Sequence, residues 1–216
     1  MDFECNWRIN SFSIFYLLIY FTTVSKLVAI SGPAAVGKTT ICDRLIKEFG
    51  PRLKRLVTAT TRAPRTSETD GVDYFFLSKK EFHKKLSDDS FLEHENIHGN
   101  MYGILKESIL DAQTEDIDLL FNIDVNGASS LRRFCSENSV LKGQLITIFL
   151  KPSSLEQLAL RMQERASESA EQMRLRLENA EEEIRREGEF DHIVESKDKE
   201  SDYRTVKDLY EKLINS

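Results

Sequence analysis

The sequence contains little cysteine, little proline and no excess of positive charge. Its 216 residues include three cysteines and four prolines, and 36 acidic residues outnumber 30 Lys and Arg, for a formal net charge of −6. Cys5, Cys42 and Cys135 are isolated, so no Cys/His cluster indicates a zinc site, and their odd number argues against a disulfide framework. We therefore expect reduced thiols and a cytoplasmic location. The acidic balance argues against a nucleic-acid partner, because sequence-independent binding to nucleic acid depends on Lys and Arg.

The longest hydrophobic run, Ser11 to Val24, is shorter than the roughly 20 residues that a membrane-spanning helix needs. It is also a poor signal peptide, because Arg8 is offset by two acidic residues and no small-residue cleavage site follows. Three readings stay open for residues 1–24: an extra packed segment, a weak membrane anchor, or a start codon assigned too far upstream. We favour the third reading, and we do not expect a membrane partner.

Runs of strand length alternate with segments that repeat apolar residues at helical spacing. The apolar runs predict strands at residues 26–30, 53–61, 119–125, 144–150 and 190–194. The amphipathic segments predict helices at residues 38–50, 155–166 and 202–214. Pro152 is expected to end the fourth strand, and Ser153 or Ser154 to cap the helix that follows. The alternation predicts an α/β domain in which helices flank a parallel sheet.

The clearest motif is Gly-x-x-x-x-Gly-Lys-Thr, which begins at Gly32. It follows a predicted strand and opens a predicted helix, which is the context that a phosphate-binding loop requires. Backbone N–H groups can converge there on phosphate oxygens, and the helix N-terminus adds its positive dipole. Lys38 would reach the β- and γ-phosphates of ATP, and the Thr39 hydroxyl would hold Mg²⁺. The expected ATP-binding residues are Gly32, Ala34, Ala35, Val36, Gly37, Lys38, Thr39 and Thr40.

This motif alone does not name a reaction, because GTPases, ATPases and several classes of kinase share it. We find no Asn-Lys-x-Asp motif of the kind with which GTPases read guanine, which disfavours that class. Downstream, Arg62 and Arg65 flank Pro64, and two guanidinium groups on a stiff turn can clamp a phosphate. Taken alone, the pair is equally compatible with a solvated turn, and Tyr74 and Tyr102 are equally compatible with packing aromatics.

Together, the order of these motifs resembles the guanylate kinase family of nucleoside monophosphate kinases. The matching pieces are the phosphate-binding loop, TTRAPR at 60–65, E-x-x-G-x-x-Y at 68–74, FLE at 91–93, GNMYG at 99–103 and ID-x-x-G at 123–127. The resemblance covers about residues 27–216. TTRAPR and GNMYG are specific to the family, whereas the phosphate-binding loop is not.

The resemblance implies a three-layer P-loop core with a parallel sheet, an inserted mixed β subdomain that binds GMP, and a helical lid. Its implied boundaries are a core of residues 25–57, 108–156 and 189–216, a GMP-binding subdomain of residues 58–107 and a lid of residues 157–188. The chain would then be a transferase that moves the γ-phosphoryl group of ATP to GMP or dGMP, with Mg²⁺ as cofactor, in purine nucleotide metabolism. Its expected partners are these nucleotides alone, with the chain as a monomer or a homodimer.

The resemblance also implies a role for each site residue. It implies that the GMP phosphate is held by Arg62, Arg65, Tyr74 and Tyr102, with Thr58, Glu93 and Asp124 at the base. Glu93 would accept from guanine N1–H and the 2-amino group, Thr58 would donate to O6, and Asp124 would lie on the base-and-metal side. Adenine has an acceptor at N1 and no 2-amino group, so Glu93 would reject it. The implied catalytic residues are Lys38, Arg62, Arg161, Arg165 and Arg176, the last three in the lid.

The implied mechanism follows from charge. The acceptor is already an oxyanion, so no general base is needed, and catalysis reduces to alignment and neutralisation of the γ-phosphoryl group. Two alternatives stay open. One is a phosphopeptide-binding module with a guanylate-kinase-like fold, against which the intact phosphate-binding loop argues. The other is a phosphokinase for another acceptor, against which Glu93 argues in combination with Tyr74 and Tyr102.

The sequence departs from the family at five places. Ala34-Ala35 replaces Ser-Gly in the loop, and Ala35 cannot adopt a positive φ without cost. Ile104 stands where Ser or Thr helps to bind guanine, Asn122 replaces an Asp, and Ser196 replaces an Asn near the adenine ring. Residues 164–169 lack the glycines of the usual lid loop. We still expect an active enzyme. We expect these departures to affect its discrimination between nucleotides and not its ability to transfer the phosphoryl group.

Overall fold

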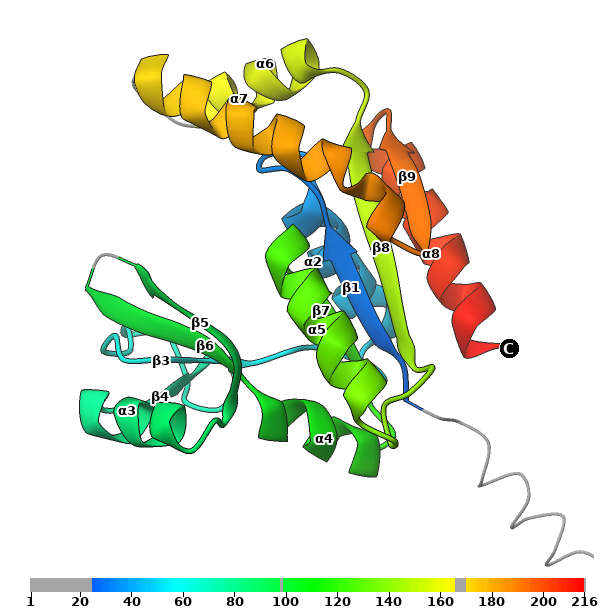
Figure 1. Cartoon of the computed structure of the whole chain (residues 1–216). Coiled ribbons are helices and arrows are strands. Elements are labelled where there is room, and N and C mark those ends of the chain that lie inside the picture. Colours follow the sequence, from blue (N-terminus) through cyan, green and yellow to red (C-terminus); the bar gives the residue numbers. More distant parts are fainter. Residues whose placement is uncertain (1–24, 98, 166–169, 216) are drawn as a thin grey trace, which may run out of the picture.

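The computed structural model describes residues 25–97, 99–165 and 170–215, so the three readings of residues 1–24 lie outside the described residues. Five parallel strands form the main sheet, in the order β2-β7-β1-β8-β9 (Figure 1). They are β1 (Leu27–Ser31), β2 (Leu53–Arg55), β7 (Asp118–Asn122), β8 (Leu145–Pro152) and β9 (His192–Ser196). The central strand β1 is buried along its whole length, as its continuous apolar run predicts.

Helices cover both faces of this sheet and form the three-layer core that the sequence predicts (Figure 1). One face carries α2 (Lys38–Phe49) and α8 (Lys199–Ile214), and the other carries α4 (Lys106–Thr114) and α5 (Val125–Glu137). Successive side chains of a strand point to opposite faces, so β1 contributes to two cores. Val28 and Ile30 pack with residues of α2 and α8. Leu27 and Ala29 pack with residues of α4 and α5.

A second, smaller sheet is mixed, as expected, and has the strand order β4-β3-β6-β5. Its strands are β3 (Thr58–Thr60), β4 (Tyr74–Phe76), β5 (Phe91–Ile97) and β6 (Asn100–Leu105). The pair β3–β4 is parallel, and the pairs β3–β6 and β5–β6 are antiparallel. Helix α3 (Lys79–Ser87) packs on this sheet through Phe82, whose ring is stacked on Phe91 at 4.3 Å between centroids. This contact gives the second sheet a hydrophobic core of its own.

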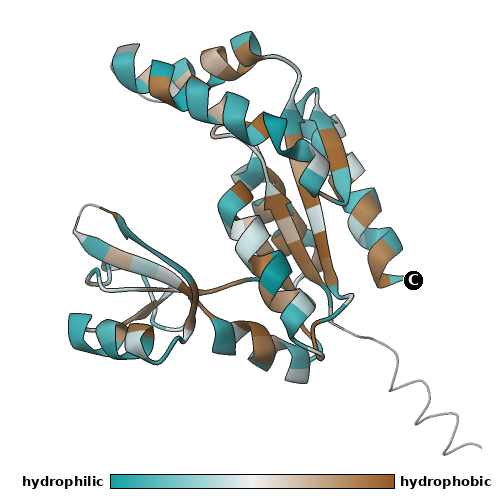
Figure 2. Ribbon diagram, in the orientation of Figure 1, coloured by the Kyte–Doolittle hydropathy of each residue, from teal (hydrophilic) through white to brown (hydrophobic). Residues whose placement is uncertain are grey.

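Two further helices, α6 (Leu155–Arg165) and α7 (Ala170–Arg185), lie beyond the carboxyl ends of the main-sheet strands, and the short 3-10 helix η1 (Glu187–Glu189) follows (Figure 1). The Ser154 hydroxyl caps α6 by accepting from the N–H of Gln157 at 3.2 Å. Figure 2 shows the hydrophobic residues gathered on the inner strands, whereas most of α7 is hydrophilic. In the part of the chain that the structure describes, no helix is both long and apolar enough to cross a membrane.

The prediction of one strand over residues 53–61 is wrong. This stretch forms β2 and β3, which belong to different sheets: β2 pairs with β7, whereas β3 pairs with β4 and β6. Between them, Leu56 is buried, and its N–H donates to the Leu120 carbonyl at 3.1 Å. The residue types favour an extended chain throughout 53–61. Only the strands that β2 and β3 pair with decide where the chain leaves the main sheet for the second sheet.

Three other predicted strands have shifted ends. β7 stops at Asn122 instead of residue 125, because Asp124 caps α5. β8 ends at Pro152, as expected, but it runs two residues past the predicted residue 150, since Lys151 and Pro152 pair with Glu195 and Ser196. β9 begins at His192 instead of residue 190, because Phe190 caps the end of η1, where its N–H donates to the Glu187 carbonyl at 3.1 Å. The ends of strands depend on tertiary contacts that a local pattern does not contain.

Candidate active site

The phosphate-binding loop joins β1 to α2 and depends on two glycines. Gly32 has a φ of 135°, and a Cβ there would lie 2.4 Å from the Leu150 carbonyl oxygen, so only glycine allows the loop to cross β8 this closely. Gly37, with a φ of 124°, is the N-cap residue of α2 and provides no side-chain cap. The first N–H groups of α2 therefore remain available to an anionic ligand in the loop.

Lys38 and Thr39 follow at the start of α2. The Lys38 ammonium donates to the carbonyl oxygens of Gly32 and Pro33, the latter at 3.0 Å. Burial lowers the pKa of Lys38, and Glu183 on α7 partly opposes this shift. The Thr39 hydroxyl accepts from the Asn122 side-chain amide at 3.2 Å. These contacts place an ammonium and a hydroxyl inside the loop, where phosphate groups would lie.

Ala35 adopts a left-handed conformation, which is costly for a residue with a Cβ. Its φ is 64°. Among the described non-glycine residues, only Asp89 and Asp116 share a positive φ, and neither lies in the loop. The loop thus holds Ala35 in a strained backbone conformation.

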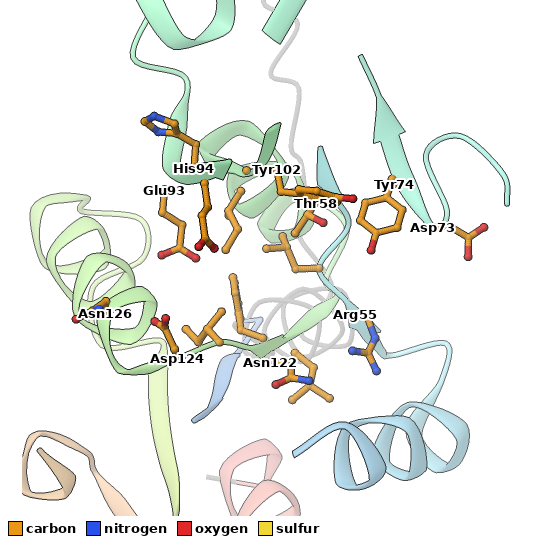
Figure 3. Close-up of a pocket in the computed structure, with 17 residues that line it drawn as sticks. Arg55, Thr58, Asp73, Tyr74, Glu93, His94, Tyr102, Asn122, Asp124 and Asn126 are labelled. Carbon is orange, nitrogen blue, oxygen red and sulfur yellow. The ribbon is translucent and has the colours of Figure 1, made fainter. Parts of the chain in front are cut away.

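A cavity of about 650 Å³ lies between the main sheet and the second sheet (Figure 3). Five residues expected to bind GMP line it: Thr58, Tyr74, Glu93, Tyr102 and Asp124. The strand register explains why some of them are neighbours. Tyr74 pairs with Thr58 across β4 and β3, and Tyr102 lies in β6, between β3 and β5. Residues that are far apart in the sequence thus share one surface.

The remaining two expected GMP-binding residues, Arg62 and Arg65, do not line this cavity. Arg62 forms a two-pronged ion pair with Glu68, at 2.8 and 2.9 Å, and its guanidinium lies 5.5 Å from the centre of the Tyr74 ring. The Arg65 side chain is exposed, and its backbone N–H donates to Glu68 at 2.8 Å. The hydrogen bond from Arg62 lowers the pKa of Glu68. Glu68 therefore holds the Arg62 side chain beside Tyr74, and it holds Arg65 only through the backbone N–H.

Two carboxylates face each other across the cavity. Glu93 lies on β5 and Asp124 caps α5, and their side chains point into the space between the sheets (Figure 3). Glu93 also lies against the first turn of α5, because a Cβ on Gly127 would be 2.9 Å from its Oε2 atom. Burial raises the pKa of Glu93, with Asp124 and Glu95 adding to the shift. The two carboxylates together provide hydrogen-bond acceptors for a ligand with N–H groups.

A second cavity, of about 180 Å³, adjoins the other side of the loop. It is lined by Ala35, Val36, Gly37, Thr40, Ile41, Arg161, Glu164, Lys199 and Asp202. Arg161 donates to the Val36 carbonyl at 3.0 Å and to the Ser196 hydroxyl at 3.2 Å. The Ser196 hydroxyl in turn donates to Asp202 at 2.6 Å. This cavity is shaped by the loop, by α6 and by the start of α8.

The three arginines expected in the lid have different surroundings. Arg161 contacts the loop, as described above, and Arg176 is exposed on α7. The side chain of Arg165 and residues 166–169 lie outside the described residues, so the predicted effect of the missing lid glycines stays a prediction.

Sequence reasoning missed several residues of the larger cavity. Arg55, Asp73, His94 and Asn126 also line it (Figure 3). Two of them had a signal, because Asn126 lies inside the ID-x-x-G motif and Asp73 inside E-x-x-G-x-x-Y, whereas Arg55 and His94 lie in no motif. Arg55 donates to Asp43 of α2 at 2.6 Å, a contact that links the cavity wall to the helix after the loop.

The described residues hold no group of three His, Cys, Asp or Glu side chains that could bind a metal by themselves. The Thr39 hydroxyl, next to Asn122, is a single oxygen ligand beside the site for phosphates. Mg²⁺ in nucleotide sites usually takes one or two protein ligands and completes its shell with phosphates and water, so the residues present fit that ion.

A phosphate-binding loop at the carboxyl end of a parallel sheet, next to a cavity lined by hydroxyls and carboxylates, defines a P-loop phosphotransferase with separate donor and acceptor sites. Residues 24–213 match the family model described as guanylate kinase. The chain belongs to the guanylate kinase family, which confirms the resemblance seen in the motifs.

Individual relatives agree with this assignment. The chain is 44% identical over 173 residues to a guanylate kinase of Chlorobaculum tepidum, covering 80% of this chain and 85% of the relative. It is 34% identical to a guanylate kinase of Clostridioides difficile, covering 88% of both chains. The crystal structure of guanylate kinase from Anaplasma phagocytophilum has the same fold, with a TM-score of 0.61 and 24% identity over 88% of this chain and 86% of that one.

Proposed function

We propose that the chain is a working guanylate kinase, which transfers the γ-phosphoryl group of ATP to GMP or dGMP and releases ADP and GDP or dGDP. The observation that carries this proposal is the combination of an intact phosphate-binding loop with an acceptor cavity that contains Glu93. The family membership and the names of the relatives support it. A site for phosphoryl transfer to GMP needs both the loop and the acceptor cavity, since the loop alone would also fit a nucleotide hydrolase.

In the proposed acceptor site, GMP lies between the two sheets with its base against Glu93. Glu93 accepts from N1–H and the 2-amino group, Asp124 lies beside it, and Thr58 provides the hydroxyl for O6. The phosphate lies toward Tyr74 and Tyr102, where two phenol groups donate to a dianion. Arg62 and Arg65 join the phosphate when the ion pair with Glu68 opens or rotates. This rearrangement is a requirement of the proposal, because Glu68 now holds the Arg62 side chain and the backbone N–H of Arg65.

In the proposed donor site, the loop N–H groups and Lys38 hold the phosphates of ATP, and Arg161 borders the adjoining cavity. The Thr39 hydroxyl would hold Mg²⁺, which when bound would supply positive charge next to the phosphates. The acceptor phosphate attacks in line and needs no general base. Arg165 and Arg176 are proposed to approach the transferring group when α6 and α7 close over the loop, which also excludes water as a competing acceptor.

We propose the same division of the chain that the resemblance implies: a core of residues 25–57, 108–156 and 189–216, a GMP-binding subdomain of 58–107 and a lid of 157–188. The second sheet and α3 support the middle unit, because they have a core of their own. A cytoplasmic location fits Cys42 and Cys135, which are buried free thiols. We keep a monomer or a homodimer as the expected state.

A coupled assay of ADP release tests the function. ATP and Mg²⁺ are mixed with GMP, dGMP, AMP, UMP or CMP, and the Lys38→Ala variant is the control. We expect turnover with GMP and dGMP, and a loss of about 10²-fold or more in the variant, because a charged contact to the transferring group is removed. Turnover with a different acceptor would favour a phosphokinase of other specificity, and no turnover with any acceptor would favour a phosphopeptide-binding module.

A further inference from the structure

We propose that Arg186 is a positioning residue that couples the acceptor site to the donor site. A nucleotide in the acceptor cavity holds the first turn of α5, and Arg186 transmits this restraint to α7, α6 and the phosphate-binding loop. This inference rests on the proposed function, because it assumes that GMP binds in the larger cavity and ATP at the loop. It concerns a residue that lines neither cavity, however, and it can fail while the proposed function holds.

Arg186 joins the end of α7 to α5 and to η1. Its guanidinium donates to the Asn126 side-chain oxygen at 2.7 Å and to the Ser129 hydroxyl at 2.8 Å. The Glu189 carboxylate accepts from the same guanidinium at 2.7 and 3.0 Å, and these hydrogen bonds raise the pKa of Arg186. Each nitrogen of the planar guanidinium is thus engaged, which fixes the side chain in one orientation.

Asn126 connects this junction to the acceptor cavity. It lines the cavity on α5 together with Asp124, whose side chain accepts from the Gly127 N–H at 2.8 Å (Figure 3). Gly127 in turn lies against Glu93, since a Cβ there would be 2.9 Å from the Oε2 atom. A ligand that contacts these walls restricts the first turn of α5 to one position. A filled cavity therefore favours the arrangement in which Asn126 accepts from Arg186 and α7 stays joined to α5.

Helix α7 continues this route to the loop of the donor site. Ala180 of α7 is buried in the hydrophobic core that contains Val36 of the loop and Leu158 and Met162 of α6. From α6, Arg161 donates to the Val36 carbonyl at 3.0 Å. A change in the position of α7 therefore moves groups that contact the loop, so the two sites are linked through packed side chains and hydrogen bonds.

A carboxylate near the end of α7 provides a second link to the loop. Ala180, Glu183 and Ile184 are three or four residues apart, so they share one face of the helix. Ile184 packs against a cluster that includes buried residues of α5, and Glu183 lies between it and Ala180. Burial raises the pKa of Glu183, whereas the positive charges of Lys38 and Arg186 oppose the rise. Release of α7 from α5 would also move this carboxylate relative to Lys38.

The experiment measures, by calorimetry, the binding of β,γ-imido-ATP with Mg²⁺ in the absence of GMP and at saturating GMP. The ratio of the two dissociation constants is the coupling factor. Arg186→Met removes the hydrogen bonds and keeps much of the aliphatic length. Arg185→Met is the matched control, because Arg185 is exposed and pairs with Glu181 on the same helix. We expect the factor in the native chain and in Arg185→Met to exceed that in Arg186→Met by about 5-fold or more.

A third variant, Arg186→Lys, decides the question if Arg186→Met folds poorly. It keeps the charge, but its single nitrogen cannot reach all three partners, so its coupling factor should lie between those of the native chain and Arg186→Met. Because each factor is a ratio of two constants measured on one protein, a uniform loss of affinity does not change it.

A coupling factor that is the same in the native chain and in the Arg186 variants would overturn the inference. An equal decrease in Arg185→Met would overturn it too, because the effect would then not depend on the contacts to α5. If GMP does not bind to the native chain, the proposed function is contradicted. If both nucleotides bind to the native chain with a coupling factor of about 1, this inference alone is contradicted.

Discussion

At the scale of single residues, Glu93 is the side chain on which the proposed recognition of the base depends most. It lies half-buried on β5, opposite Asp124, and burial raises its pKa above the usual range of a glutamate. In the proposed acceptor site, the ionised form would accept two hydrogen bonds from a guanine-like base, whereas the protonated form would present a donor to N1–H. The proposal therefore requires GMP to bind the form of Glu93 that burial disfavours.

This conflict predicts a pH dependence. Because the pKa of Glu93 is raised, the affinity for GMP should fall as pH decreases through that raised value, at a higher pH than an ordinary glutamate would cause. We expect Glu93→Gln to raise the KM for GMP about 10- to 100-fold at neutral pH, the effect of hydrogen bonds to a charged group. KM is measured against pH in the native protein and in Glu93→Gln. The titration of the GMP phosphate affects both proteins, so a rise in KM at low pH that only the native protein shows is caused by Glu93. Parallel profiles would contradict the role of Glu93.

A second prediction at this scale concerns Ala35. Its φ of 64° strains a residue with a Cβ, so Ala35→Gly should raise the free energy of unfolding by about 0.5–1 kcal/mol. Ala34→Gly is the matched control, because Ala34 is the neighbouring residue of the same loop and does not have a positive φ. There, glycine only adds freedom to the unfolded chain, and we expect a loss of about 0.5–1 kcal/mol. Denaturant unfolding of the three proteins would reveal these opposite signs, and equal effects would contradict the strain.

At the scale of elements, one side chain ties the end of α7 to the first turns of α5. Arg186 donates to Asn126 at 2.7 Å, to Ser129 at 2.8 Å and to Glu189 of η1 at 2.7 Å. Helix α5 begins beside Asp124, in the wall of the acceptor cavity. The base of the proposed lid is thus attached to the helix that borders the acceptor site.

Loss of this attachment should cost stability. Arg186→Met keeps much of the aliphatic length and removes the hydrogen bonds, so we expect a decrease of about 1–2 kcal/mol in the free energy of unfolding. Arg185→Met is the control, because Arg185 is exposed and makes an ion pair with Glu181 of 3.4 Å on the same helix. That change should stay within about 0.5 kcal/mol. Similar losses in both variants, measured by denaturant unfolding, would mean that α7 is not held through Arg186.

The elements themselves show what the sequence could predict. β1 and α2 were predicted to within a residue at each end, because a buried strand, a glycine loop and an amphipathic helix are local patterns. The stretch 53–61 was predicted wrongly, since its two halves look alike and differ only in the sheets that they join. Strand β5 contains Glu93 but has little alternation of apolar and polar residues, and only its pairing with β6 defines it.

At the scale of the whole molecule, motifs far apart in the chain converge on one cavity. The resemblance to the family implies a shared site for Thr58, Tyr74, Glu93, Tyr102 and Asp124, and all five line one cavity of the structure. The roles of these residues stay predictions. The sequence could not predict that Glu68 pairs with Arg62 and accepts from the Arg65 backbone N–H, because these contacts depend on the folded turn and not on the motif.

The measurement that tests the account most directly is calorimetric binding of GMP and of ATP to three proteins: the native chain, Lys38→Ala and Glu93→Gln. If acceptor and donor occupy separate sites, Glu93→Gln should weaken GMP binding by about 10-fold or more and leave ATP binding nearly unchanged. Lys38→Ala should do the reverse. If instead one variant weakens both ligands equally and the other weakens neither, GMP and ATP share a site, and the two-site account is wrong.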